Sequence, residues 1–188
     1  MAYVSASEVK AYLGINTSTE DALISSLMER AQGIIDAYTG RKFEAETATR
    51  YFDGNFVDGQ DLNLWGYDLL GITALTNGDE TIISSADYRL FPRNDNPKWK
   101  IRLNSDKSWN LSGDAEISIA GTWGYAATAP FDIVHACIRL TAFLYRQKDT
   151  SADIDRPMIT GDGVTIMPSG LPADVQKLLD RYKRKLAI

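Results

Sequence analysis

His135 and Cys137 are the first residues of this 188-residue chain to consider for chemistry, because it contains one histidine and one cysteine. A nucleophile and its base must lie within hydrogen-bond reach. On a helix, residues two positions apart point in different directions, so this pair does not form a catalytic dyad. A single cysteine excludes an internal disulfide, and a single histidine does not anchor the usual zinc cluster. We expect Cys137 to be a core residue and His135 a hydrogen-bonded structural imidazole.

Two acidic loops offer oxygen atoms of the kind that calcium binds. They are Asp53-Gly54-Asn55 and Asp58-Gly59-Gln60-Asp61. Their spacing is not that of an EF-hand, and Asp-Gly pairs are typical of tight turns, so we interpret both as turns. Phosphate-binding loops, nucleophile elbows and H-E-x-x-H motifs do not occur in the sequence. We expect no catalytic residue, cofactor or metal, with a hydrolase that uses Asp or Glu pairs as the remaining catalytic alternative.

The four tryptophans all lie in the β-rich middle part of the chain or at its exit. They are Trp65, Trp99, Trp109 and Trp123. Exposed tryptophans stack on sugars, whereas buried ones form the core of a sheet with one packed face. We favour the core interpretation. The alternative function is a carbohydrate- or cell-surface-binding module that presents Trp65 or Trp109.

The net charge of −5, from 20 basic and 25 acidic side chains, is distributed unevenly. The basic row Lys98, Lys100 and Arg102 has acidic neighbours, so we expect no tight grip on DNA. Residues 171–188 alone are clearly basic, and their cations are Lys177, Arg181, Lys183, Arg184 and Lys185. Two interpretations are open: a solvated face with cations near the C-terminus of a helix dipole, or a docking site for an acidic partner.

The composition, with 44% hydrophobic and 24% charged residues, is typical of a globular domain. No apolar run approaches the roughly 18–20 residues of a membrane span. The N-terminal residues do not resemble a signal peptide. We expect synthesis in the cytosol and no membrane association.

Helical periodicity occurs at the two ends of the chain. Ser5-Ala6-Ser7-Glu8 is a capping box that begins a short helix ending at Gly14. Apolar residues at helical spacing predict a longer helix over residues 21–38, stopped by Gly40.

Two prolines mark the later helices. Pro130 precedes a helix with a broad apolar face, which we expect to be central in the fold. Pro172 precedes a final helix whose apolar stripe reaches Leu186.

The period changes to two between these helical regions, which is typical of an antiparallel sheet with one solvated face. Trp99, Ile101 and Leu103 alternate with the basic row, and Ile117 alternates with polar neighbours in the same way. Asn77-Gly78 predicts a type I′ hairpin turn. Further strand candidates are Thr49 to Phe52, Leu62 to Trp65, and Tyr88 to Phe91.

This order of elements predicts an α+β fold, a helical bundle with an inserted antiparallel β-rich unit between the second and third helices. Residues 1–46 would supply the N-terminal helices and residues 47–124 the inserted unit. Residues 125–188 would supply the C-terminal helices of the bundle. A stretch at 149–170 without periodicity is predicted to be a long loop.

Four stretches together carry a resemblance to a known family: residues 9–15, residues 21–41, Gly124-Tyr125 with the helix from Pro130 to Arg146, and residues 171–183. Their order and spacing resemble the head-tail connector (adaptor) proteins of tailed bacteriophages. The likeness covers roughly the helical half of the chain. The β-rich unit resembles an elaboration that longer members of the family carry.

The resemblance implies a structural, non-catalytic protein that forms a ring, usually a dodecamer, beneath the portal protein. Such a ring extends the DNA exit channel toward a stopper or tail-completion protein, and DNA passes through without specific binding. The family's C-terminal segment commonly reaches the portal, which would make the five tail cations portal or neighbour contacts. The implied location is the head-tail interface of the virion, with the host cytoplasm before assembly.

Overall fold

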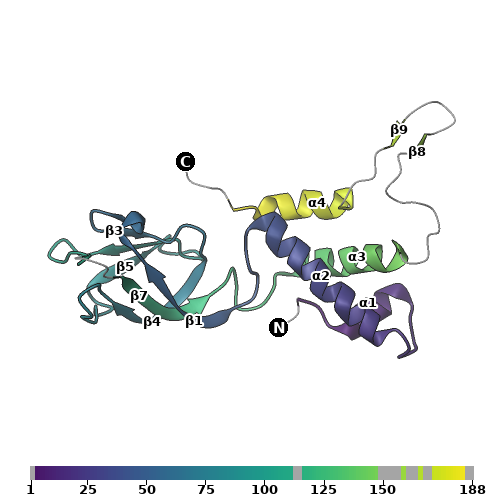
Figure 1. The fold of residues 1–188 in the computed structure, drawn as a ribbon, viewed down its shortest axis with the longest axis horizontal. Coiled ribbons are helices and arrows are strands. Elements are labelled where there is room, and N and C mark those ends of the chain that lie inside the picture. Colours follow the sequence, from purple (N-terminus) through teal and green to yellow (C-terminus); the bar gives the residue numbers. More distant parts are fainter. Residues whose placement is uncertain (1–2, 112–115, 148–157, 160–164, 167–170, 185–188) are drawn as a thin grey trace. The chain divides into compact units, whose positions relative to one another are not determined.

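A computed structural model of the chain describes residues 3–111, 116–147, 158–159, 165–166 and 171–184. The chain divides into two compact units, Met1–Thr39 with Pro130–Lys183 and Gly40–Ala129 with Arg184–Ile188. The described residues form four α-helices and antiparallel sheets, so the predicted α+β class is confirmed (Figure 1). Within this described part, none of the helices has both the length and the apolar character that a membrane crossing requires.

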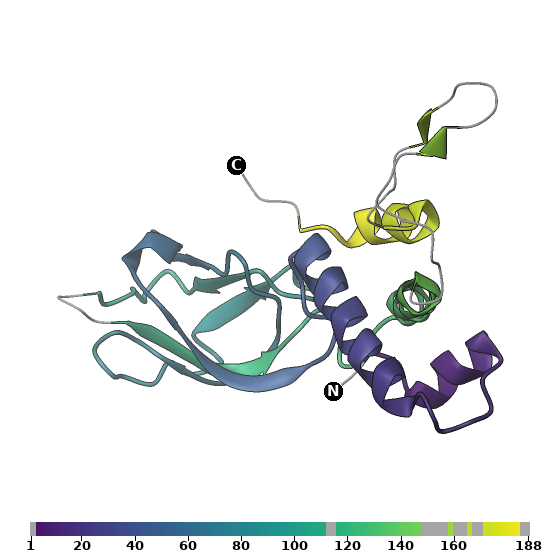
Figure 2. The ribbon, with the colours of Figure 1, turned by 45° about the vertical axis from the view of Figure 1, so that its right-hand side comes forward.

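The helical unit consists of α1 (Ala6–Leu13), α2 (Asp21–Thr39), α3 (Phe131–Gln147) and α4 (Ala173–Leu179). Helix α3 contacts each of the other three, as its broad apolar face predicts (Figure 2). Its buried side chains recur at helical spacing and include Ile133, Ala136, Cys137, Leu140 and Thr141. Burial of this stripe drives the packing of the unit.

The predicted ends of the first two helices are confirmed. The Ser5 hydroxyl accepts a hydrogen bond from the Glu8 backbone N–H at 3.3 Å, and the Glu8 carboxylate accepts one from the Ser5 N–H at 2.8 Å. Gly14 follows α1 with φ of 75°, and Gly40 follows α2 with φ of 66°. Glycine adopts this left-handed conformation without a steric cost, which is why both helices stop there.

Tyrosine hydroxyls join helical segments that are distant in sequence. Each donates a hydrogen bond to a carboxylate, and such charge-assisted bonds are stronger than neutral ones. The pairs are Tyr3 with Asp36 at 2.5 Å, Tyr38 with Asp180 at 2.7 Å, Tyr182 with Asp132 at 3.2 Å, and Tyr145 with Glu20.

The last helix is shorter than its apolar stripe predicts. Helix α4 ends at Leu179, a 3₁₀ turn covers Asp180–Tyr182, and Lys183 is extended. The contacts of Asp180 with Tyr38 and of Tyr182 with Asp132 fix this turn, so tertiary contacts override the local helical pattern. Leu186 lies outside the described residues.

The β-rich unit contains two antiparallel sheets. The first has the order β1 (Glu46–Phe52), β7 (Ile117–Trp123), β4 (Leu69–Thr76). The second has the order β2, β3, β6, β5, and its strands are Val57–Asp58, Asp61–Asn63, Lys100–Leu103 and Tyr88–Phe91. A 3₁₀ turn, Gly54–Phe56, precedes β2. Strands therefore overlap each stretch where the sequence predicted one, although β3 ends at Asn63 and does not reach the predicted end at Trp65.

The two sheets share one apolar core. It consists of Phe52, Leu62, Leu64, Leu69, Leu75, Ile101, Ile117, Ile119 and Trp123. The Trp123 indole N–H donates to the Ala48 carbonyl at 2.9 Å, so the ring is buried with its polar atom satisfied. Burial alternates along all seven residues of β7, as the period of two predicts.

Trp99 departs from the predicted alternation. It precedes β6, whose Ile101 and Leu103 are buried, yet its own side chain is 50% exposed. The backbone N–H of Trp99 donates to the Phe91 carbonyl, and the Trp99 carbonyl accepts from the Leu64 N–H. The backbone of Trp99 is therefore paired, while its ring lies outside the core. The prediction that Trp99 lies on the apolar face is therefore wrong.

The turn after β4 is longer than the predicted type I′ hairpin. The Asn77 N–H donates to the Thr81 carbonyl, and the residue with positive φ is Glu80, at 65°. The Asn77 side chain accepts from the Gly78 and Asn110 N–H groups at 3.0 and 2.9 Å. Asn77 therefore stands at the start of the turn and not in its centre, with its side-chain oxygen bound to two backbone N–H groups.

The predicted loop at 149–170 lies largely outside the described residues. Its described part is a two-stranded antiparallel ladder between β8 (Met158–Ile159) and β9 (Thr165–Ile166).

One carboxylate joins β3 to β6. Asp61 accepts two hydrogen bonds from the Arg102 guanidinium at 2.5 and 2.7 Å and one from Lys100 at 2.9 Å. The Asp61 side chain is 16% exposed. The Arg102 guanidinium, followed by Lys100, lowers the pKa of Asp61 to about 2. Asp61 is therefore a structural anion of β3 that binds two cations of the neighbouring strand β6.

Substitution of Gly121 by alanine should destabilise the β-rich unit. An added Cβ would lie 2.3 Å from the Gly71 carbonyl oxygen, which is backbone in the neighbouring strand. We expect a loss of about 1–3 kcal/mol in the free energy of unfolding, measured by denaturant titration. Gly33→Ala is the matched control: it sits in α2 with nothing within 4 Å and should gain about 0.4–1 kcal/mol. Equal effects of both substitutions would contradict this account.

The contribution of Asp61 to stability should disappear in acid. A carboxyl with a depressed folded-state pKa stabilises the fold above its unfolded pKa, near 4, and this stabilisation is lost as pH falls toward the folded value of about 2. We expect Asp61→Asn to lower the free energy of unfolding by about 1 kcal/mol at neutral pH, a modest value because solvent screens the half-exposed Arg102. The difference from the parent should shrink between about pH 5 and 2. A difference that is constant with pH would refute this assignment.

Candidate assembly interface

Two of the five predicted tail cations project from the surface of the helical unit. Lys177 lies in α4 and Arg181 in the following 3₁₀ turn, and both are exposed. Neither forms an ion pair with the residues that the structure describes. Residues four apart lie on the same side of a helical segment, so these two charges are neighbours on the surface. They are available to an anionic partner.

Lys183 is held within the helical unit. Its ammonium lies 2.9 Å from the Asp180 carboxylate and 4.1 Å from the centre of the Tyr38 ring. The hydrogen bond to Asp180 is the main reason that the pKa of Lys183 is raised. Its side chain remains about half exposed, at 48%, so a partner can still contact it.

Arg184 is used inside the β-rich unit. Its guanidinium donates to the Asp68 carboxylate at 2.9 Å and to the Gly40 carbonyl at 3.1 Å, and its side chain is only 16% exposed. Burial lowers the pKa of Arg184, and the charge of Asp68 opposes this shift. Arg184 is therefore a structural cation. Lys185, the fifth predicted residue, lies outside the described residues.

Asp68 also binds a second arginine. Arg41 donates to the other carboxylate oxygen at 2.6 Å and lies over the Tyr125 ring, 5.3 Å from its centre. The backbone carbonyl of Asp68 accepts from the Gly124 N–H at 2.8 Å. Asp68 thus joins the three stretches through which the chain enters and leaves the β-rich unit. We call Arg41, Asp68 and Arg184 the anchor triad.

The anchor triad was not found from the sequence. Asp68 is 27 residues from Arg41 and 116 from Arg184, and its side chain is 6% exposed. A charged residue in the connection between two strands has no local pattern that signals burial. Such a signal would come only from its partners, which are distant in the chain.

Cys137 and His135 do not form a reactive site. Cys137 is buried, and burial raises the pKa of its thiol to about 12, so the thiolate nucleophile does not form near neutral pH. The core prediction for Cys137 is thus confirmed. His135 is exposed on α3, contrary to its expected structural role. Helical geometry directs it away from the stripe that buries Cys137.

The acidic loops form turns. The Asp53 carboxylate accepts from the Asn55 N–H at 2.8 Å and caps the 3₁₀ turn, while Asp61 binds Lys100 and Arg102. Among the residues that the structure describes, no group of three His, Cys, Asp or Glu side chains is arranged to hold a metal ion.

The tryptophans divide between core and surface. Trp123 is buried, and Trp109 is partly buried with its indole N–H donating to the Gln60 carbonyl at 3.0 Å. Trp65 and Trp99 are 54% and 50% exposed. Trp65 lies beside Phe56, with ring centres 6.4 Å apart.

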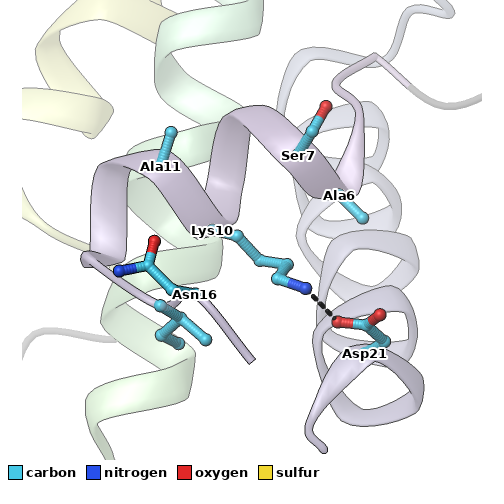
Figure 3. Close-up of a pocket in the computed structure, with 7 residues that line it drawn as sticks. Ala6, Ser7, Lys10, Ala11, Asn16 and Asp21 are labelled. Atoms are coloured by element: carbon cyan, nitrogen blue, oxygen red, sulfur yellow. Dashed lines mark hydrogen bonds and ion pairs between the residues drawn. The ribbon is translucent and has the colours of Figure 1, made fainter. Parts of the chain in front are cut away.

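A pocket of about 480 Å³ lies between α1 and the start of α2 (Figure 3). Small side chains border it, and Lys10 reaches across to Asp21 with 2.6 Å between ammonium and carboxylate. The residues that line it are Ala6, Ser7, Lys10, Ala11, Ile15, Asn16 and Asp21. The only cation and the only carboxylate among these lining residues are paired with each other, and no histidine lies among them to act as a base for the Ser7 hydroxyl.

The comparisons with known proteins identify the family and the fold. The model of the head completion protein family matches residues 2–185. No curated protein matches. Among solved structures, the fold is similar to a chain of the neck of an empty gene transfer agent particle computed with C6 symmetry, at 19% identity and a TM-score of 0.68. It is also similar to a chain of the native neck computed with C12 symmetry, at 18% identity and a TM-score of 0.66. Both alignments cover 97% of this chain and 90% of the other.

A third similar structure is a chain of the virion of the native gene transfer agent particle, at 21% identity and a TM-score of 0.61. That alignment also covers 97% of this chain and 90% of the other. These likenesses support the fold, and none of them supports a carbohydrate-binding module. Since the family match spans nearly the whole sequence, the chain belongs to the head completion protein family and is a structural head-tail connector.

Proposed function

We propose that copies of this protein form a ring in the virion, at the junction of head and tail. The family match carries the proposal, because it covers residues 2–185. The similar neck chains come from particles whose necks were computed with C6 and C12 symmetry, which favours a cyclic assembly here. A ring closed by head-to-tail contacts requires two different, complementary surfaces on each subunit.

We propose further that the helical unit is a bundle and that residues 47–124 form an insertion between its second and third helices. The contacts of α3 with α1, α2 and α4 support the bundle. The second compact unit begins directly after α2, at Gly40, and ends just before α3, at Ala129, which supports the insertion.

The partners in this proposal are a portal protein on the head side and a stopper or tail-completion protein on the tail side. The exposed cations Lys177 and Arg181 would contact the portal or a neighbouring subunit, together with Lys183 and Lys185. Arg184 would position the C-terminal residues rather than touch the partner, because its guanidinium binds Asp68.

DNA would pass through the ring without specific binding. The net charge of −5 supports this, because a net-negative wall repels phosphates. The role would be assembly alone, without catalysis, and the free subunits would wait in the host cytoplasm before they join the virion.

Electron microscopy of particles made with and without this protein tests the proposal. We expect particles that lack this protein to have heads without tails, whether or not the heads retain their DNA. The complete particle should show a ring of this chain at the neck. A complete neck in particles that lack the protein would refute the proposal.

Reversal of the two exposed tail cations should weaken attachment to the head. The double variant Lys177→Glu and Arg181→Glu should lower the amount of this protein bound to tailless heads by about tenfold or more, because two attractive charge contacts become repulsive. Quantitative blotting of purified heads measures the loss. The matched control is Arg30→Glu with Arg93→Glu, which reverses two other exposed arginines. Equal losses in both variants would indicate a general charge effect and contradict this docking site.

A further inference from the structure

The outward face of the second sheet carries a cationic patch made of Arg89, Phe91, Trp99, Lys100 and Arg102. Arg89 pairs with Arg102 across β5 and β6, and Phe91 pairs with Lys100. The Lys100 ammonium lies 5.4 Å from the centres of both the Phe91 and Trp99 rings, and the Arg102 guanidinium lies 5.6 Å from that of Phe91. The five side chains therefore form one continuous surface.

The patch has an excess of positive charge that the unit itself does not neutralise. Asp61 binds both Lys100 and Arg102, so one carboxylate serves two cations. Arg89 is exposed and forms no ion pair with the described residues. Like charges directly opposite each other on a sheet are destabilising, which makes the Arg89 and Arg102 pair a cost in the isolated subunit. An anion from outside would remove that cost.

The aromatic residues of the patch point to a protein partner. Trp99 is 50% exposed, and Phe91 is partly exposed beside it. Tryptophan and arginine are enriched among the residues that dominate the energy of protein interfaces. Exposed apolar area framed by charge is typical of such a docking surface.

A second patch of the same unit has complementary character. It consists of Asp79, Glu80 and Ile82, in the turn after β4, and we call it the acidic patch. Ile82 is 79% exposed, and both carboxylates are exposed. Glu80 has a φ of 65°, a conformation that costs an ordinary residue about 1–2 kcal/mol. The turn therefore holds a carboxylate where glycine would be less strained.

The two patches lie toward opposite ends of one strand. Leu69, the first residue of β4, bridges to Lys98 beside Trp99, and Thr76, the last residue, bridges to Ile82. Eight residues of extended chain span about 23 Å between the first and last Cα atoms. A cationic, aromatic patch near one end and an acidic, aliphatic patch near the other are the two surfaces that head-to-tail association requires.

We propose that the acidic patch of one copy of this chain docks on the cationic patch of the next. In this contact Asp79 and Glu80 approach Arg89 and Arg102, and Ile82 covers the exposed part of Trp99. The inference rests on the proposed ring and specifies one of its subunit contacts. It assigns the β-rich unit a role in ring closure.

The composition of the cationic patch favours a protein surface over DNA. Of its three cations, Lys100 and Arg102 are already bound to Asp61, which leaves Arg89 as the one without an ion pair among the described residues. Affinity for nucleic acid grows with the number of phosphates that clustered cations neutralise. Ile82 and the two carboxylates, in contrast, match both the apolar and the charged parts of the patch.

Charge reversal in the purified full-length protein tests the contact. We expect Arg89→Glu and Glu80→Arg each to lower the self-association constant by about tenfold or more, measured by sedimentation velocity at low ionic strength. The double variant Arg89→Glu with Glu80→Arg should recover most of the loss, because the pair is restored with its signs exchanged. The parent should also associate more weakly as salt is added.

Arg30→Glu and Glu29→Arg are the matched controls, since both residues are exposed on α2 and carry the same charge changes. The contact would be overturned if the single variants associated like the parent, or if the controls lost as much affinity as the single variants. A parent protein that is monomeric at every concentration would also overturn it. Duplex DNA binding that Arg89→Glu abolishes would also overturn it, in favour of a nucleic-acid surface.

Failure of the contact is distinguishable from failure of the ring. Microscopy of particle necks counts copies of the chain independently of the patches. A ring in which Arg89→Glu subunits pack like the parent would refute the contact alone, whereas a neck without a ring would refute the proposed function.

Discussion

The β-rich unit depends on the buried carboxylate of Asp68. Its two oxygens each bind one guanidinium, at 2.6 Å to Arg41 and 2.9 Å to Arg184, and its backbone carbonyl binds Gly124. Removal of one member of a buried ion pair costs about 3–5 kcal/mol, because the remaining charge is left without a partner or water. Here one carboxylate has two such partners. The stretches at which the chain enters and leaves the unit are therefore joined by a single residue, through its carboxylate and its backbone carbonyl.

The distribution of charge elsewhere follows from the same physical rule. Cations that have a carboxylate or carbonyl nearby are part of the structure: Lys98, for example, donates to the carbonyls of Pro92, Arg93 and Asp95. Those without an ion pair among the described residues, such as Lys177, Arg181 and Arg89, lie on the surface. The paired charges therefore contribute to the fold, and the unpaired ones are the charges that no described residue of the chain neutralises.

Much of the fold could be predicted from the sequence because its signals are local. A capping box spans four residues, a glycine stop acts at one position, and alternation along β7 needs only neighbouring residues. The errors arose where a distant contact decided the outcome. Trp99 lies outside the core although it continues the alternation of Ile101 and Leu103 in the sequence. The Asn77 side chain binds Ser108 and Asn110, about thirty residues away, so the turn forms differently.

The sequence by itself determined the α+β class, the ends of the first two helices, most strand positions and the core role of Cys137, since each depends on interactions within a few residues. It also carried the family resemblance, through the order of those elements. Only the tertiary structure separated Arg184 and Lys183, which have partners, from Lys177 and Arg181, and only it placed two complementary patches toward the ends of one strand. The physical reason is that the partner of a charged side chain is chosen by proximity in space. Asp68 and Arg184, 116 residues apart, carry no local pattern that announces their contact.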